Sequence, residues 1–196
     1  LEALWRSWWR VFDSAQAALD LIFGTYLNRS VSLQRHFLIA VQALELLHRA
    51  FLSGGVESDD EFKVRSDRLV APFRGADRRC VKRLLRWANE KRLQDRLDDL
   101  LDGMDERVRS SAVSDDYAEI TANTRNYLTH YDARTKARAA DADRQFELAD
   151  ESILIAQDFL IRQLQVEESE RWQRVSRSDL FRRVKYRKGQ RGGVDL

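Results

Sequence analysis

Apolar residues recur at helical spacing in five segments of the chain. The predicted helices cover residues 1–23, 31–52, 77–101, 115–131 and 137–166. Gly24 is expected to weaken or end the first helix, and Asn89 marks a break within the third. The stretch 56–77, which contains Ser, Asp and Pro72, is typical of an irregular connection or of short helices. The pattern therefore predicts an all-α fold.

The composition supports long helices. The 196 residues include only 8 Gly and 1 Pro, and both residue types disfavour helix interiors. Runs of β-branched residues are rare, which argues against a strand-rich fold. The length suits one sizeable domain. We expect a single helical domain over residues 1–170, followed by a basic tail over residues 171–196.

Cysteine usage and hydropathy limit the setting of the protein. Cys80 is the only cysteine, so no intramolecular disulfide can form, and we expect a partly buried thiol in a reducing cytoplasm. No run approaches the ~18 consecutive apolar residues that span a bilayer. The sequence begins at Leu1 and lacks a signal peptide's charged start. We therefore expect a fragment of a longer protein, with any sensing domain outside it.

Two side-chain clusters have a functional and a structural interpretation. Three tryptophans near the start, Trp5, Trp8 and Trp9, could stack on nucleic-acid bases, but helix-spaced aromatics are more often core or interface residues. A set of carboxylates could hold a metal, but the interleaved Arg92 and Arg96 favour an ion-paired, solvated face. These carboxylates are Asp95, Asp98, Asp99 and Asp102. The structural interpretation is preferred for both clusters, and no metal or other cofactor is expected.

Residues 124–132 combine polar side chains in a way that no other segment does. An apolar seam would hold this helix on the core through Tyr117, Ile120, Thr124, Tyr127, Leu128 and Tyr131. At about 100° per residue, Asn126 and His130 lie ~40° apart and away from the seam, whereas Arg125 lies ~140° from His130. The helix is therefore expected to present an imidazole, an amide and a guanidinium.

These three groups suit the cleavage of an RNA phosphodiester by the substrate's own 2′-hydroxyl, which needs neither a metal nor a protein nucleophile. His130 can exchange a proton near neutral pH, and Arg125 can hold the phosphate oxygens. Asn126 could orient the phosphate or the imidazole. Because one histidine serves only one end of the reaction, a second copy from another subunit makes a composite site attractive.

The string Arg125-Asn126-Tyr127-Leu128-Thr129-His130 resembles the Arg-x4–6-His motif of HEPN domains, and it is similar to the ApeA-like branch of abortive-infection proteins. The segment 37–49, FLIAVQALELLHR, resembles the early helix of that branch. With the helical block 84–101, the resemblance covers about residues 30–165. It implies a HEPN-like helical bundle with extra N-terminal and C-terminal helices.

The resemblance also implies function. It suggests a homodimeric, metal-independent endoribonuclease in which Arg125 and His130 are catalytic and Asn126 assists. Glu45 matches a polar residue that faces the active site in related domains; the alternative is a structural ion pair with an arginine of the motif helix. His48 lies on the apolar line and is expected to be packed, and His36 has no evident role.

The C-terminal tail is strongly basic. Trp172, Phe181 and Tyr186 are interleaved with cations that could contact RNA phosphates, or else belong to a solvated helix that docks on the bundle. The candidate RNA-binding residues are Arg182, Arg183, Lys185, Arg187 and Lys188. The alternatives to a nuclease are a non-catalytic HEPN dimerisation or RNA-binding module, and a helical scaffold with an accidental motif.

Overall fold

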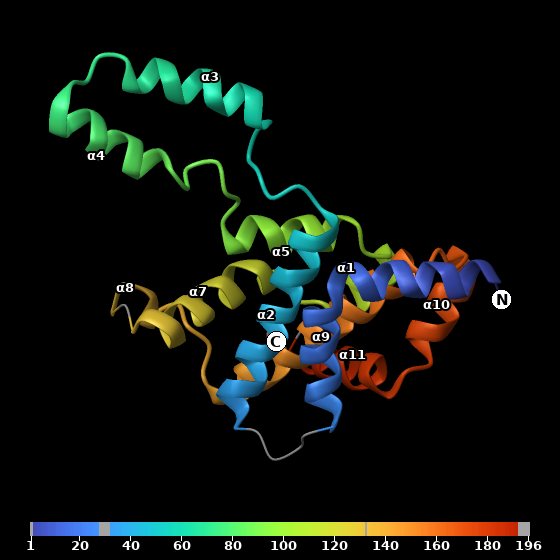
Figure 1. Cartoon of the computed structure of the whole chain (residues 1–196). Coiled ribbons are helices and arrows are strands. Elements are labelled where there is room, and N and C mark those ends of the chain that lie inside the picture. Colours follow the sequence, from blue (N-terminus) through green and yellow to red (C-terminus); the bar gives the residue numbers. More distant parts are fainter. Residues whose placement is uncertain (1, 28–31, 132, 192–196) are drawn as a thin grey trace. The chain divides into compact units, whose positions relative to one another are not determined.

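The computed structural model describes residues 2–27, 32–131 and 133–191 (Figure 1). Leu1, Asp132, the start of the expected core at residue 30 and the last five tail residues, 192–196, lie outside them. The described residues form eleven helices and no strand, which confirms the all-α prediction. The chain divides into two compact units, a smaller one over residues 53–92 and a larger one on either side of it.

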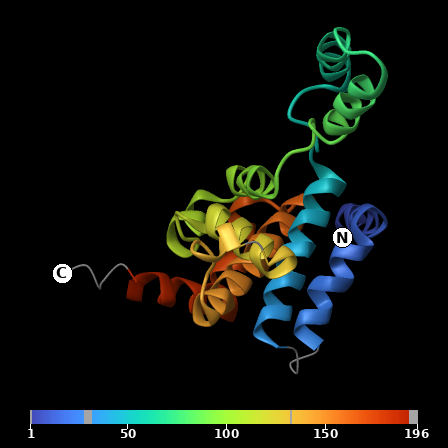
Figure 2. The same cartoon turned by 90° about the vertical axis from the view of Figure 1, so that its left-hand side faces the viewer.

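The described residues of the larger unit form nine helices, and α2 and α9 lie at its centre. Their bounds are α1 Glu2–Leu27, α2 Leu33–Phe51, α5 Leu93–Asp102, α6 Glu106–Ala112, α7 Tyr117–His130, α8 Ala133–Lys136, α9 Ala142–Gln163, α10 Glu168–Ser176 and α11 Asp179–Arg191. Figure 2 shows α1 and α2 side by side and antiparallel. Phe37 and Leu44 of α2 and Leu154 and Phe159 of α9 are fully buried in the core between them.

The first helix differs from its prediction at Gly24. It continues to Leu27 because Leu19 and Ile22 are buried, and this burial outweighs the cost of about 1 kcal/mol for a helical glycine. The helix is instead interrupted at Ala15, whose φ of −134° and ψ of 26° are not helical. Trp5 and Trp9 are exposed, so these two tryptophans are not core residues.

The smaller unit is a helical hairpin of α3 (Asp59–Val70) and α4 (Gly75–Leu85), which lie side by side in Figure 1. Short helices were one of the two alternatives predicted for this stretch. A capping box of Ser58 and Glu61 begins α3. Asn89 lies in the break between α4 and α5, as predicted. Cys80 of α4 is exposed, so the expectation of a partly buried thiol is wrong.

Candidate active site

The motif helix α7 is fixed at its N-terminal end by a buried tyrosine. Tyr117 is fully buried, and its hydroxyl lies 2.7 Å from the Ser152 hydroxyl of α9. Burial raises the pKa of Tyr117 above its ordinary value, so the phenol stays neutral. Tyr131, at the other end of the predicted apolar seam, is exposed. The seam therefore anchors the first half of α7 and leaves its last turn accessible.

Thr124 fastens the middle of α7. Its buried hydroxyl donates to the Ile120 carbonyl at 2.6 Å and accepts from the Ala140 backbone N–H at 2.8 Å. Ala140 directly precedes Asp141, whose side chain caps α9. The Thr124 hydroxyl thus connects α7 to the residue before the N-cap of α9. Because Thr124 directly precedes Arg125, this link also holds the backbone of Arg125 in place.

Arg125, Asn126 and Glu45 come together between α7 and α2. The Arg125 guanidinium donates to Glu45 Oε2 at 3.3 Å and to Asn126 Oδ1 at 3.4 Å. Glu45 also accepts from Arg49, one turn further along α2, at 3.2 Å. The side chains of Arg125 and Glu45 are 31% and 20% exposed, so both are held yet reachable from solvent. The ion pair predicted as an alternative for Glu45 is present.

His130 is the last residue of α7 and is exposed. Tyr131 follows in the left-handed conformation (φ 51°), which is uncommon for a residue other than glycine, and its N–H bonds to the Tyr127 carbonyl at 2.8 Å. The chain therefore turns directly after the imidazole. Among the described residues, His130 forms no hydrogen bond or ion pair with Arg125, Asn126 or Glu45.

This arrangement offers two chemical groups on the second half of one helix. The guanidinium of Arg125 can bind a phosphate oxygen while Glu45 restricts its orientation. The imidazole of His130 is open to solvent and to a second macromolecule, so it can transfer a proton to or from a bound substrate.

The family model for Apea-like HEPN matches residues 38–170, which is more than half of the chain. The chain belongs to the Apea-like HEPN family. The match agrees with the range expected from the sequence, and it leaves α1 and α11 outside as the additional N-terminal and C-terminal helices. Searches of curated protein sequences and of solved structures found no match.

Two further observations concern the described part of this HEPN protein. No helix there combines the length and apolar character that crossing a membrane requires. No three His, Cys, Asp or Glu side chains gather there in a group that could hold a metal ion.

The carboxylates of α5 are not simply a solvated face. His48 is fully buried, as predicted, and its Nε2 lies 2.6 Å from Asp99 Oδ2. Arg96 is 2% exposed, with its guanidinium 3.3 Å from His48 Nδ1. The interleaved charges of this segment predict a solvated face for Arg96, so the buried cluster of Arg96, His48 and Asp99 was not expected. The spacing of Arg96 and Asp99, one turn apart on a helix that carries buried leucines, was the available signal.

The basic tail of the HEPN protein folds as α10 and α11 on the larger unit. Asp150, a buried carboxylate of α9, accepts from Arg183 at 2.9 Å and from Arg187 at 2.7 Å. Lys188 donates to two backbone carbonyls, at Ser110 and Val113. Of the five candidate RNA-binding residues, these three therefore hold the tail in place.

The other two candidates lie on the outer side of α11. Arg182 is exposed and pairs with Asp179 in its own helix. Lys185 is also exposed, and its ammonium lies 5.9 Å from the centre of the Phe181 ring. Both side chains therefore interact within α11 itself and can meet a polyanion from solution.

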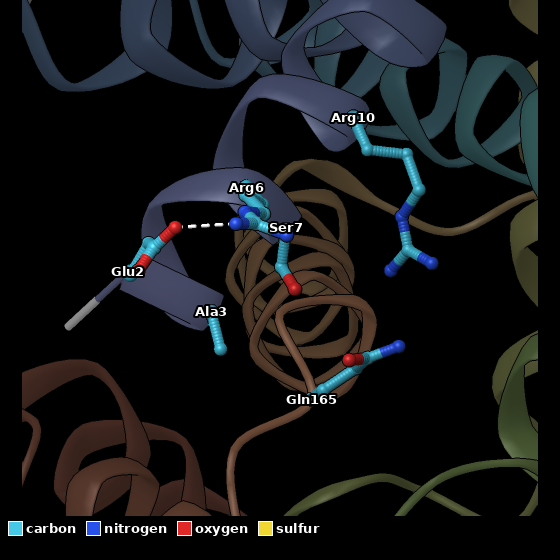
Figure 3. Close-up of a pocket in the computed structure, with 6 residues that line it drawn as sticks. All are labelled: Glu2, Ala3, Arg6, Ser7, Arg10 and Gln165. Atoms are coloured by element: carbon cyan, nitrogen blue, oxygen red, sulfur yellow. Dashed lines mark hydrogen bonds and ion pairs between the residues drawn. The ribbon is translucent and has the colours of Figure 1, made fainter.

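A pocket of about 590 Å³ lies at the N-terminal end of α1 (Figure 3). Glu2, Arg6, Arg10 and Gln165 are among its lining residues, and Glu2 and Arg6 form an ion pair. Arg10 donates to the Gln163 carbonyl at 2.6 Å. None of the motif residues lines this pocket, so it is separate from the candidate active site.

Proposed function

We propose that the protein is a metal-independent endoribonuclease that acts in abortive infection against phage. The observation that carries the proposal is the motif helix, which fixes Arg125 against Glu45 and Asn126 and ends in an exposed histidine. Membership of the Apea-like HEPN family supports the same assignment.

In the proposed reaction the substrate supplies its own nucleophile. A base removes the proton of a ribose 2′-hydroxyl, the 2′-oxygen bonds to the adjacent phosphorus, and the bond from phosphorus to the 5′-oxygen breaks. The leaving 5′-oxygen takes up a proton, so the products are a 2′,3′-cyclic phosphate and a 5′-hydroxyl. His130 exchanges one of these protons, and Arg125 stabilises the charge that develops on the phosphate oxygens.

A second subunit completes the proposed site. One imidazole can transfer a proton at either the attacking or the leaving oxygen. Among the described residues of one chain, no second histidine forms a hydrogen bond with His130. A homodimer that brings two motif helices together would provide both proton-transfer groups and two guanidinium groups. The exposed position of His130 at the end of α7 suits such an assembly.

The test is cleavage of labelled single-stranded RNA in EDTA by wild type, His130→Ala and a control, His36→Ala. His36 lies near the start of α2 and outside the motif. The control variant therefore also lacks one imidazole but retains all residues of the candidate site. We expect wild type and the control to leave 2′,3′-cyclic phosphate ends, and His130→Ala to be inactive. Cleavage that requires a metal, or that survives in His130→Ala, would falsify the assignment.

The alternative is a non-catalytic HEPN module that dimerises or binds RNA. It is favoured by the lack of a described contact between His130 and Arg125 within one chain. It predicts that the wild type does not cleave RNA, with or without a metal, but still binds RNA or self-associates.

A further inference from the structure

Helix α4 of the smaller unit carries a row of cations, which we call the basic face. At about 100° per residue these side chains fall within an arc of about 140° on one side of the helix and its C-cap. They are Arg78, Arg79, Lys82, Arg83 and Arg86. All are exposed, and within the described part of the chain none of them forms an ion pair.

Several cations elsewhere in the protein are paired with buried acids. Asp150 binds Arg183 and Arg187, and the fully buried Glu151 binds Arg144 at 2.7 Å and Arg191 at 3.1 Å. Pairing largely cancels the field that such groups project into solvent. The basic face keeps its charge, and the surrounding residues 74–92 contain eight Lys and Arg against two acids. An uncompensated cluster of this density attracts a polyanion.

Exposed aromatic and apolar groups adjoin the basic face. Trp87 is 62% exposed, and Leu84 is 71% exposed. The Arg86 guanidinium lies over the Trp87 ring, 4.9 Å from its centre. A cation that borders an exposed indole provides a phosphate contact and a stacking surface next to each other. Proteins that bind single-stranded nucleic acids combine these two kinds of contact.

The base of the hairpin is closed, so these groups stand on an ordered scaffold. Val56 N–H donates to the Asn89 carbonyl at 2.8 Å, and Lys91 N–H donates to the Gly54 carbonyl at 2.9 Å. The Asn89 side chain also exchanges two hydrogen bonds of 3.1 Å with the Glu57 backbone. A Cβ at Gly55 would lie 2.8 Å from the Glu57 carbonyl oxygen, which explains a glycine there.

We propose that the basic face and Trp87 bind single-stranded RNA, with the cations on successive phosphates and the indole stacked on a base. The inference deepens the proposed function, because it assigns a substrate-holding surface outside the motif helix. The identity of the polymer rests on that function, whereas the binding itself does not depend on catalysis.

The experiment measures binding of a labelled single-stranded RNA to the full chain carrying His130→Ala, over a range of salt concentrations. The basic face is tested by the triple variant Arg79→Gln, Lys82→Gln, Arg83→Gln. The matched control removes three other exposed cations by Arg6→Gln, Arg10→Gln, Arg174→Gln. Arg6 and Arg174 pair with acids of their own helices, and Arg10 binds a carbonyl.

We expect the triple variant of the basic face to bind at least about 10-fold more weakly and its salt slope to fall by about 2, since each phosphate contact on a single strand contributes roughly 0.7. Trp87→Ala should weaken binding about 10-fold with an unchanged slope. The control triple variant should bind like its parent. Circular dichroism of each variant checks that the helices are retained.

Several results would overturn the inference. These are an absence of RNA binding by the parent, unchanged binding by the basic-face variant, equal losses in both triple variants, and binding to anionic phosphatidylserine vesicles in preference to RNA. Cleavage is measured separately on chains that keep His130. Lost binding in the variant together with an inactive wild type would refute the proposed function alone, whereas His130-dependent cleavage with unchanged binding would refute this inference alone.

Discussion

At the residue scale, Glu45 restricts the orientation of Arg125. The carboxylate lies between Arg125 and Arg49, at 3.3 Å and 3.2 Å, and is only 20% exposed. A guanidinium held in this way loses less freedom when it meets a phosphate. Glu45 is therefore a positioning residue in the proposed site.

This role predicts a specific kinetic change. Glu45→Ala should lower kcat for RNA cleavage about 10-fold and leave KM nearly unchanged, because binding persists while the guanidinium is misplaced. Glu45→Gln, which keeps an oxygen acceptor for Arg125, should recover part of the loss. Steady-state cleavage assays on the three proteins, with RNA in excess over enzyme, measure both constants. A change in KM alone, or equal effects of Ala and Gln, would contradict a positioning role.

A second residue-scale prediction concerns Asp158 of α9, which is 1% exposed. Burial raises the pKa of this carboxyl, against opposing effects of a backbone hydrogen bond from Asp105 and of the charges of Arg162 and Arg171. A folded-state pKa above the unfolded value means that the folded state binds the proton more tightly. This contribution to stability is therefore present at low pH and is lost as the pH rises from the ordinary value of 3.8 through the raised one.

Asp158→Asn should remove that pH dependence, because the amide does not titrate. Urea unfolding between pH 4 and 7 should show the wild type losing stability relative to the variant as the pH rises. The control is Asp179→Asn, which makes the same change at an exposed acid of α11 instead of a buried one. A constant difference between wild type and Asp158→Asn across this range would show that the raised pKa is not relevant to folding.

At the element scale, helical periodicity predicts most of the fold. The predicted bounds of α2 and α7 differ from the observed ones by at most two residues. The prediction fails where a distant partner decides. Gly24 does not end α1, because α1 packs along α2. For the basic tail the sequence leaves RNA contact and docking on the bundle both open, and the pairing with the buried acids of α9 shows that α11 docks.

The attachment of α11 had a signal in the sequence. Arg183, Arg187 and Arg191 recur every four residues and so share one helix face, opposite the adjacent acids Asp150 and Glu151. Two neighbouring acids in a helix that otherwise carries buried apolar residues are costly unless they are paired. The sequence could therefore predict that Asp150 and Glu151 pair with cations, whereas only the structure shows that these cations belong to α11.

This pairing predicts that α11 depends on Asp150. Asp150→Ala leaves Arg183 and Arg187 without their carboxylate and should destabilise the protein by about 3 kcal/mol. Thermal unfolding should then shift by about 6–12 °C. The matched control, Asp179→Ala, removes an exposed partner of Arg182 and should cost less than about 1 kcal/mol. Equal shifts in the two variants would mean that Asp150 does not anchor α11.

At the scale of the whole molecule, one chain provides only half of the proposed chemistry. Four site residues are predictable from the sequence, namely Arg125, Asn126, His130 and Glu45, and the first, second and fourth lie together in the structure. His130 stays at the exposed end of its helix, because α7 ends there and Tyr131 turns the chain. The arrangement of two motif helices in an assembly is a property of two chains, and no spacing within one sequence specifies it.

The composite site can be tested by mixing subunits. If cleavage needs His130 from both chains, only dimers of two wild-type chains are active, and activity follows the square of the wild-type fraction. Co-refolding wild type with an equal amount of His130→Ala should then leave about one quarter of the activity of the same total amount of wild type. Chains that act independently would leave about one half. A control mixture with His36→Ala should keep full activity, which excludes losses caused by refolding. Activity that depends linearly on the wild-type fraction would therefore mean that cleavage needs His130 from one chain only.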